Sequence, residues 1–255
     1  KFKEVIKKVS TDGLIKNASC DFDSSSTLTL TERILQPTYQ QVNLQLCKSD
    51  FHSDWEAQSM GYSAFDTLPT SFADFLIAHV AAKVAQKTEQ NIWNGAAANA
   101  GEFGGFKELM TADADVVDVA AVGGGVNSGN VIAQLGAVVD AISSQNVARA
   151  YVRGLGGFAT NLGAAGTDNK GTQWYSNNVL SFDGLKLVVG NGLADNTMVA
   201  AEKSNLFFGT SLVSDQTEVK VIDMSDIDGS QNVRVVLRFS AGVQYGIGAD
   251  CVLYS

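Results

Sequence analysis

The sequence predicts an α+β fold, in which helices and strands occupy separate blocks of the chain. Three observations carry this prediction. Residues 70–94 have apolar side chains at helical spacing, residues 39–47 alternate between apolar and polar side chains, and residues 185–254 contain β-rich runs separated by turns. The 255 residues are enough for one large domain or two closely associated subdomains with a substantial core.

Two segments near the N-terminus are predicted to be antiparallel strands. Residues 24–34 alternate small polar with apolar side chains, and residues 39–47 place valine and leucine on one face and asparagine and glutamine on the other. The Gln-Pro-Thr sequence at 36–38 has turn chemistry, so we expect the two segments to pair as a hairpin. Because an isolated two-stranded ribbon is only marginally stable in water, we expect this hairpin to lie on another chain.

The strongest helical pattern covers residues 70–94 and ends before Gly95, a residue suited to follow a helix. Such a helix is roughly 35 Å long at 1.5 Å per residue, and it is much longer than the mean globular helix of about 11–12 residues. We therefore predict that it is a structural spine. Its apolar side chains recur every four residues and share one face: Phe72, Leu76, Val80 and Val84.

The rest of the chain combines weaker signals with glycine-rich stretches. Residues 115–119 have the pattern of a strand, a second helix with one apolar face is expected at about 130–143, and residues 148–152 have the pattern of a buried strand. Residues 153–173 are rich in glycine and are predicted to form a long loop. No internal repeat is present in the sequence.

The composition favours a globular protein with much of its surface covered by partner subunits. Hydrophobic residues make up 45% of the chain and charged residues only 18%, against a typical charged share of about 25%. The net charge of −9 argues against tight or sequence-specific DNA binding, because an acidic chain repels the phosphate backbone. No apolar run reaches the roughly 18 residues of a membrane span, so no membrane partner is expected.

Cysteine and histidine do not indicate a disulfide framework, a metal site or a catalytic base. Cys20, Cys47 and Cys251 are odd in number and widely separated, as expected of free thiols in a protein made in a reducing compartment. His79 lies between apolar neighbours in the long helix and is interpreted as a core or interface residue. His52 has no candidate nucleophile nearby and is interpreted as part of a loop that starts a helix.

Two short motifs have a partial likeness to ligand-binding loops. Residues 154–159 fit G-x-G-x-x-A, but the residues after them are too rich in glycine, asparagine and aspartate to open the helix that a dinucleotide site requires. Asp223, Asp226 and Asp228 precede Gly229 with the wrong spacing for a Ca²⁺-binding loop, so a solvated turn is expected. We therefore predict no catalytic residue, no cofactor and no bound metal, and hence no enzyme.

Four stretches of the chain, together with the order of the predicted elements, indicate a family. The stretches are 35–55, 91–95, 201–215 and 242–254, and the elements run from an extended hairpin through a long helix and a loop-rich centre to a β-rich end. The third stretch has an asparagine, an aliphatic residue, a glycine-threonine pair and an aspartate in order, starting at Asn205. In these respects the chain resembles the tailed-phage major capsid protein, whose Hong Kong 97 fold is shared with encapsulins and herpesvirus shell floors.

The resemblance implies a capsid fold with an N-terminal arm, an extended β-hairpin loop, a long spine helix, and peripheral and axial domains. It implies a structural subunit that assembles with identical subunits into hexamers and pentamers of an icosahedral shell around double-stranded DNA, which it contacts only non-specifically. Portal, scaffold and decoration proteins would be further partners, and the protein would reside in the virion after assembly in the host bacterial cytoplasm. The implied division is arm 1–21, extended loop 22–50, peripheral domain 51–144 with spine helix 71–94, axial domain 145–215, and peripheral strands 216–255.

The resemblance also implies that the extended loop lies over a neighbouring subunit. Some members of the family join a lysine of this loop to an asparagine of a neighbour, but no lysine occurs between Lys16 and Lys48, so we expect no such crosslink. Many members lose an N-terminal segment by cleavage, and a chain that starts at Lys1 without methionine is compatible with this. The residues expected to make assembly contacts are Leu28, Leu30, Arg33, Leu35 and Tyr39.

Three other functions fit parts of the sequence. An encapsulin would have the same fold but would enclose a cargo enzyme, and the phage-like stretches favour DNA instead. A β-rich phage tail or surface-binding protein is disfavoured by the long helix, and an α+β hydrolase is disfavoured by the lack of converging His, Asp, Ser or Cys motifs. The acidic balance would suit a shell wall along which a genome slides without binding.

Overall fold

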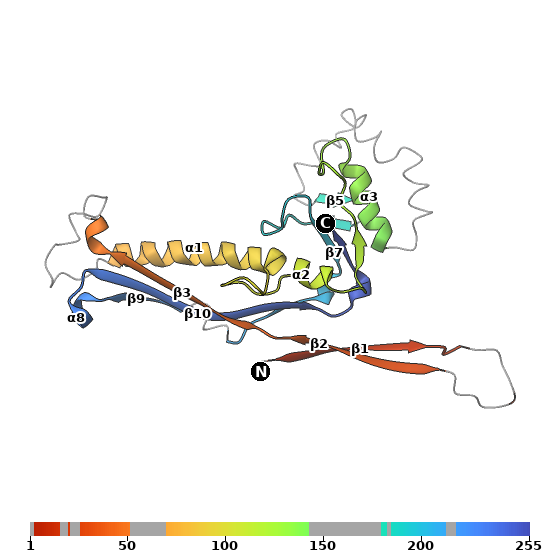
Figure 1. The fold of residues 1–255 in the computed structure, drawn as a ribbon, viewed down its shortest axis with the longest axis horizontal. Helices are drawn as coiled ribbons and strands as arrows, with labels where there is room; N and C mark the ends of the chain where they lie inside the picture. The colour runs from red at the N-terminus through yellow and green to blue at the C-terminus, as the bar shows by residue number, and fades with distance from the viewer. Residues whose placement is uncertain are drawn as a thin grey trace. The chain divides into compact units, whose positions relative to one another are not determined.

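The computed structural model describes residues 3–15, 20, 26–51, 70–142, 180–182, 185–212 and 218–255. These residues contain both helices and strands, which confirms the predicted α+β class (Figure 1). The chain divides into two compact units. The first comprises Lys1–Phe106 and Phe207–Gly246, and the second comprises Lys107–Leu206 and Ile247–Ser255.

A four-stranded sheet forms the body of the first unit. Its central strand is β10 (Asn232–Tyr245), which pairs with β3 (Thr38–Cys47), β8 (Leu206–Gly209) and β9 (Val219–Asp223). β3 is antiparallel to β10 along its full length. The strand predicted at 39–47 is therefore confirmed, and its valine and leucine side chains lie on the face of the sheet that packs against a helix.

That helix is α1 (Thr70–Asn94), which runs along the sheet (Figure 1). The four-residue spacing of its apolar side chains is confirmed as the spacing of its buried face. Fully burying an aliphatic or aromatic side chain contributes roughly 1.5–3 kcal/mol, so this stripe accounts for much of the attachment of α1 to the sheet. The buried cluster consists of Phe72, Leu76, Val80, Val233 and Val235, and Val42, Leu44, Leu46, Val84, Val219 and Val221 pack around it.

A tight loop follows α1. The backbone N–H of Gly95 donates to the carbonyl of Asn91 at 3.1 Å, and the N–H of Gly105 donates to the carbonyl of Gly95 at 2.8 Å. A Cβ at Gly95 would clash with the Phe103 carbonyl oxygen, and a Cβ at Gly105 would lie 2.5 Å from the Asn91 carbonyl oxygen. Both positions therefore require glycine, because any side chain would push the backbone apart.

Glu102 fastens this loop to α1. Its carboxylate accepts hydrogen bonds from Lys87 Nζ at 2.5 Å, from the backbone N–H of Ala96 at 3.1 Å and from Asn99 Nδ2 at 3.1 Å. These hydrogen bonds, with that from Lys87 the strongest influence, lower the pKa of Glu102 from 4.5 to about 2. A carboxyl group with a lowered folded-state pKa stabilises the fold above its ordinary pKa, and the contribution is lost as the pH falls through the folded-state value.

We therefore expect Glu102→Gln to remove part of the acid sensitivity of the protein. The melting temperature of the wild type should fall as the pH is lowered from 4.5 toward 2, and that of the variant should fall less over the same window. Melting curves followed by circular dichroism at a series of pH values measure the difference. Glu218→Gln, at an exposed glutamate, is the control, and equal acid sensitivity of wild type and Glu102→Gln would contradict this role.

An antiparallel hairpin is formed by β1 (Glu4–Asp12) and β2 (Thr27–Leu35), which pair along their full length. The sequence predicted a different hairpin, between 24–34 and 39–47, and that pairing is wrong because the second segment pairs with β10. Pairing with β10 places the apolar face of β3 against α1, away from water. A two-stranded hairpin offers no such burial, so the longer-range pairing is favoured.

The second unit contains a three-stranded sheet with the strand order β4-β11-β7. β11 (Cys251–Tyr254) is parallel to β4 (Val117–Val119) and antiparallel to β7 (Met198–Ala201). β4 lies within the segment 115–119, so the strand predicted there is confirmed. Every residue of β11 is buried, which makes this strand the centre of the second unit.

α3 (Val131–Ile142) packs on this sheet, which confirms the second predicted helix. Val138 of α3 lies in one buried cluster with Tyr254 of β11. The Tyr254 hydroxyl accepts a hydrogen bond from the backbone N–H of Val122 at 3.0 Å and donates one to Gln134 Oε1 at 3.0 Å. The buried hydroxyl group is thus satisfied, as a polar group in a core must be.

The remaining elements are short. They are α2 (Phe106–Thr111), the paired strands β5 (Leu180–Phe182) and β6 (Leu185–Leu187), α8 (Ser225–Asp228), and 3₁₀ turns at Lys48–Phe51, Lys203–Asn205 and Gly248–Asp250. The strand predicted at 148–152, the loop predicted at 153–173, the motif at 154–159 and His52 lie outside the described residues.

Asn205, from the stretch 201–215, connects two backbone segments of the second unit. It is buried, and its Oδ1 accepts a hydrogen bond from the backbone N–H of Ile247 at 2.8 Å. Its Nδ2 donates to the carbonyl of Ile247 at 2.8 Å and to Cys251 Sγ at 3.3 Å. The side-chain amide therefore pairs with both backbone polar groups of Ile247, which gives this asparagine a structural role.

Asn205→Ala should lower the free energy of unfolding by about 2 kcal/mol or more, because buried polar groups left without partners cost about 1–3 kcal/mol each. Urea unfolding followed by circular dichroism measures the change. Ser204→Ala, at the exposed position before it, is the control and should change stability by less than about 0.5 kcal/mol. An equally small change for Asn205→Ala would contradict the structural role.

Candidate functional site

The β1–β2 hairpin presents its apolar side chains on one face. Its antiparallel register puts Val9 opposite Leu30, and the other apolar residues of this face lie two or four positions away along the strands. Each of them is between 43% and 64% exposed, although they share a face. We call this surface the apolar ribbon face: Val5, Val9, Leu28, Leu30 and Ile34.

The opposite face of the hairpin is polar along most of its length. Lys8, Ser10 and Asp12 alternate with the apolar positions of β1 and lie opposite threonines of β2. On the apolar ribbon face itself, Lys7 Nζ lies 3.6 Å from Glu32 Oε1 in an exposed ion pair, which contributes at most about 1 kcal/mol. The hairpin is therefore an amphipathic ribbon, and its exposed apolar side is typical of an interaction surface.

The base of the hairpin is held by the first unit. Leu35 is only 8% exposed, and a Cβ at Gly209 would come within 2.9 Å of its Cδ2 atom, so the absence of a side chain at 209 makes room for the leucine. The Arg33 guanidinium carbon lies 4.5 Å from the centre of the Tyr245 ring. The Gln244 Nε2 atom donates to the carbonyl of Ile34 at 3.2 Å. These contacts anchor one end of the hairpin, whereas the apolar ribbon face stays exposed.

The five residues predicted to make assembly contacts divide into two groups. Leu28 and Leu30 belong to the apolar ribbon face, and Tyr39 at the start of β3 is 75% exposed. Arg33 and Leu35 contact their own unit at the base of the hairpin. A substitution at Leu35 would therefore disturb the subunit itself, and the assembly roles of all five residues stay predictions.

Three residues of the apolar ribbon face were not singled out from the sequence: Val5, Val9 and Ile34. The sequence signal for the two valines is weak, because Ile6 and Lys7 break the alternation of apolar and polar residues between Val5 and Val9. β1 carries Lys7 and Lys8, whereas no lysine occurs between Lys16 and Lys48, and the absence of a crosslink stays a prediction.

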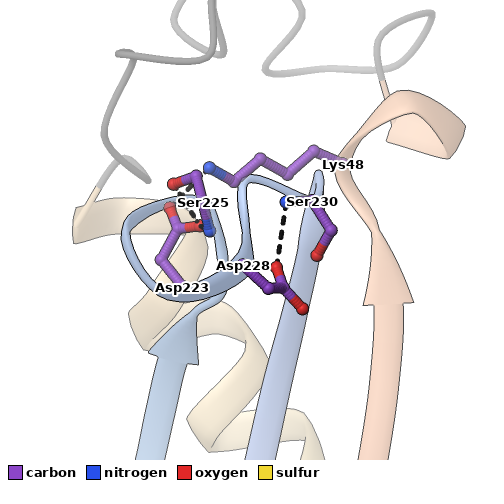
Figure 2. Close-up of polar contacts among 5 residues, drawn as sticks. All are labelled: Lys48, Asp223, Ser225, Asp228 and Ser230. Carbon is purple, nitrogen blue, oxygen red and sulfur yellow. Dashed lines mark hydrogen bonds and ion pairs between the residues drawn. The ribbon is translucent and has the colours of Figure 1, made fainter.

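A polar cluster closes the turn between β9 and β10 (Figure 2). Lys48 Nζ lies 2.5 Å from Asp223 Oδ2, and the two side chains are only 10% and 18% exposed. Asp223 Oδ1 accepts hydrogen bonds from the backbone N–H of Ser225 at 3.0 Å and from its hydroxyl at 2.7 Å. Asp228 Oδ1 accepts from the backbone N–H of Ser230 at 2.9 Å. The sequence predicted a solvated turn here, whereas the structure shows the one-turn helix α8 and a largely buried Asp223.

The ionisation of Asp223 fits a structural role for this cluster. Burial alone would raise the pKa of Asp223, but the hydrogen bonds from Lys48 and Ser225 outweigh burial and lower the pKa below its ordinary value of 3.8. The carboxylate is thus charged at neutral pH and paired with the Lys48 ammonium. Within the described residues, no group of three or more His, Cys, Asp or Glu side chains is placed to hold a metal ion.

The other candidate residues do not form a catalytic arrangement in the described part of the chain. His79 is exposed on α1, where its ring stacks on Phe75 at a centroid distance of 6.1 Å, so it is not a core residue. The three cysteines are free: Cys251 is buried, Cys47 is half-buried and Cys20 is exposed. No helix among the described residues is long and apolar enough to cross a membrane.

No protein-family model and no curated protein sequence matches this chain. Solved structures are similar to it over nearly its whole length. One from Mycobacterium phage Che8 is 13% identical with a TM-score of 0.54, covering 98% of this chain and 84% of that chain. The capsid of a native GTA particle is 11% identical with a TM-score of 0.55, covering 99% and 84%. One from Mycobacterium phage Adephagia is 13% identical with a TM-score of 0.52, covering 100% and 85%.

At these sequence identities the similarity shows the fold. The fold is that of a tailed-phage major capsid protein, so the resemblance drawn from the sequence is confirmed at the level of the fold. The similarity covers the N-terminal hairpin as well as both compact units, because nearly every residue of the chain is included.

Proposed function

We propose that this chain, which has the fold of a tailed-phage major capsid protein, is the shell-forming subunit of a phage capsid and not an enzyme. The observation that supports this most is the similarity to phage and capsid structures over 98% to 100% of the chain. A second support is the apolar ribbon face, which an isolated subunit leaves exposed to water. Many identical neighbours are the simplest cover for such a surface.

In the proposed assembly, identical subunits form hexamers and pentamers of an icosahedral shell that encloses double-stranded DNA. The extended loop of this subunit is the β1–β2 hairpin, and its apolar ribbon face lies on the neighbouring subunit. Fully burying an exposed aliphatic side chain contributes roughly 1.5–3 kcal/mol, so covering five half-exposed ones contributes on the order of 5 kcal/mol per contact. Part of this is lost to the entropy of association.

The two compact units support a proposed division into domains. The first unit, with α1 as the spine helix, corresponds to the peripheral domain, and the second unit corresponds to the axial domain. This division differs from that proposed from the sequence, because residues 107–144 and 247–255 belong to the second unit and residues 207–215 belong to the first. The segment 1–21 that was expected to be a separate arm provides β1 of the hairpin.

The proposed partners and location follow from this role. Portal, scaffold and decoration proteins would contact the shell, and the subunit would reside in the virion after assembly in the host bacterial cytoplasm. DNA would be contacted only non-specifically, because the net charge of −9 opposes tight binding of phosphates.

Expression of the chain in bacteria, followed by sedimentation and electron microscopy, tests the proposal. We expect closed particles of uniform size, built from rings of five and six subunits. A stable monomer at concentrations far above those of the cell would contradict the proposal. Particles that enclose a co-purifying enzyme instead of being empty or filled with DNA would favour an encapsulin-type compartment.

A further inference from the structure

The sheet of the first unit has a second face, opposite the one that packs on α1. Alternation along β10 sends Val233, Val235 and Leu237 into the buried side and the residues between them to the other side. Polar side chains of β3 and β9 next to these residues are exposed as well. We call this surface the outer sheet face: Gln41, Asn43, Gln45, Lys220, Arg234 and Arg238.

Three cations gather on the outer sheet face. Lys220 on β9 lies opposite Val236 on β10, so Arg234 and Arg238 are its diagonal neighbours at about 7–8 Å. Arg234 Nε donates a hydrogen bond to Gln45 Oε1 at 2.9 Å. Among the described residues of β3, β9 and β10, no acidic side chain alternates onto this face, but the exposed Glu218, one residue before β9, continues it at the position opposite Arg238. With three cations to one carboxylate the face is net positive, although the chain as a whole is acidic.

The three cations differ in how far the subunit compensates them. Hydrogen bonds from Ser230 and, more weakly, the charge of Arg234 lower the pKa of Asp228 in the adjoining turn, so Arg234 has an anionic neighbour. Arg238 and Lys220 make no ion pair with any residue that the structure describes. Like charges in neighbouring strands destabilise a sheet, and an anionic surface placed over them removes that repulsion.

An acidic surface is present on the second unit. β11 pairs with β7 at Cys251 opposite Ala201 and with β4 at Val252 beside Val117, so the residues just beyond these strand ends lie at the same end of the sheet. They include three exposed carboxylates, one beyond the end of each strand, with Lys203 next to one of them. We call this surface the acidic sheet end: Asp115, Glu202 and Asp250.

A second copy of the chain fits the outer sheet face better than DNA does. In a ring of identical subunits each contact is heterologous, so one surface of a subunit meets a different surface of the next. Copies that each carry a net charge of −9 repel one another unless cations on one surface face carboxylates on the other. The same net charge opposes binding of DNA, because a protein binds the phosphate backbone through many cations and its carboxylates repel it.

We infer that the outer sheet face of one subunit docks on the acidic sheet end of a neighbouring copy, with Arg238 and Lys220 as the main cations. The inference rests on the proposed capsid function and adds to it a specific electrostatic contact. This contact is separate from that of the apolar ribbon face, since it uses different strands and a different kind of interaction. This electrostatic contact determines which surfaces of two subunits bind each other, because surfaces of like charge repel.

Charge reversal in the full-length chain tests this contact. Lys220→Glu with Arg238→Glu should reduce the yield of particles at least tenfold, while circular dichroism and the melting temperature show a folded subunit. Lys83→Glu with Lys186→Glu, at two exposed lysines elsewhere, makes the same change in net charge and should assemble like the wild type. Adding Glu202→Lys and Asp250→Lys to the first pair should restore particles, because the two surfaces again have opposite charges.

The outcomes separate this inference from the proposed function. Particles from Lys220→Glu with Arg238→Glu in normal number would overturn the inference, and normal particles that retain less DNA would assign the face to DNA instead. Failure of the added lysines to restore assembly would also overturn it, as would equal loss in the control pair. If the reversed subunit does not fold, Lys220→Gln with Arg238→Gln replaces it, with the same expected loss. A wild type that forms no oligomer would overturn the proposed function as well.

Discussion

Val9→Asp combined with Leu30→Asp is expected to abolish particle formation and to leave the subunit folded. The two side chains lie opposite one another on the apolar ribbon face and are 60% and 58% exposed. In the proposed assembly a neighbouring subunit covers them, so each new carboxylate would be buried without a partner at a cost of several kcal/mol. Because a shell repeats the same contact between all its subunits, each contact would carry this cost, and the yield of particles should drop below detection.

The next pair along the hairpin provides a matched control. Ser10→Asp with Thr29→Asp also places two carboxylates opposite one another on β1 and β2, but on the polar face. Any damage to strand pairing itself should be the same in both variants, so only the covered face should distinguish them. Sedimentation measures assembly and circular dichroism measures folding. Normal particles from the first variant, or equal loss from both, would contradict the assignment of the apolar ribbon face.

Leu76→Ala should lower the free energy of unfolding by about 2–5 kcal/mol. Leu76 is 4% exposed and packs with Val233 and Val235 between α1 and the sheet, so its loss leaves a cavity in the main core of the first unit. For a chain of this size, 1 kcal/mol shifts the melting temperature by about 2–4 °C, which predicts a decrease of roughly 4–20 °C. Urea and thermal unfolding both measure it.

Phe75→Ala is the control for this prediction, because it removes a larger side chain from the same helix one residue earlier. Phe75 is 50% exposed, so the substitution should cost at most about 1 kcal/mol. Equal losses for the two variants would contradict the assignment of the four-residue stripe as the buried face of α1. The comparison also reports on assembly, since a folded Phe75→Ala subunit that forms no particles would place the exposed face of α1 in a contact between subunits.

The elements with strong local periodicity were predictable from the sequence. The stripe that begins at Phe72 repeats every four residues because one side of α1 is buried along its length, and this spacing is visible without any knowledge of the partner sheet. The strand at 39–47 alternates for the same reason, since one of its faces is covered and the other faces water. In both cases the buried positions recur at a regular spacing within the element's own sequence, so the buried face can be identified from that sequence alone.

Strand pairing was not predictable in the same way. β3 pairs with β10, which lies near the other end of the chain. The local sequence pattern of neither strand indicates which strand is its partner. The Gln-Pro-Thr sequence at 36–38 suggested a hairpin turn, whereas the chain passes close over Gly242 here: a Cβ at that position would lie 3.0 Å from the Gln36 carbonyl oxygen. The predicted partner of β2 was wrong as a consequence, and so was the extent of the ribbon.

Only part of the candidate site was predictable, because alternation within a strand is visible in the sequence but the register between strands is not. Leu28 and Leu30 were identified because they alternate with threonines, but the valines of β1 lie among lysines and were not singled out. Only the register shows that Val9 completes a face with Leu30 and that Leu35 belongs to the core of its own subunit. The outer sheet face was missed because its cations come from two strands, and only their register places Lys220 beside Arg234 and Arg238.

A cryo-electron microscopy reconstruction of assembled wild-type particles, at a resolution that shows side chains, examines the central claim most directly. We predict that Val9, Leu28 and Leu30 of each subunit are in contact with the surface of the next subunit. Density that leaves this side of the ribbon facing solvent, or that folds the ribbon back over its own subunit, would contradict it.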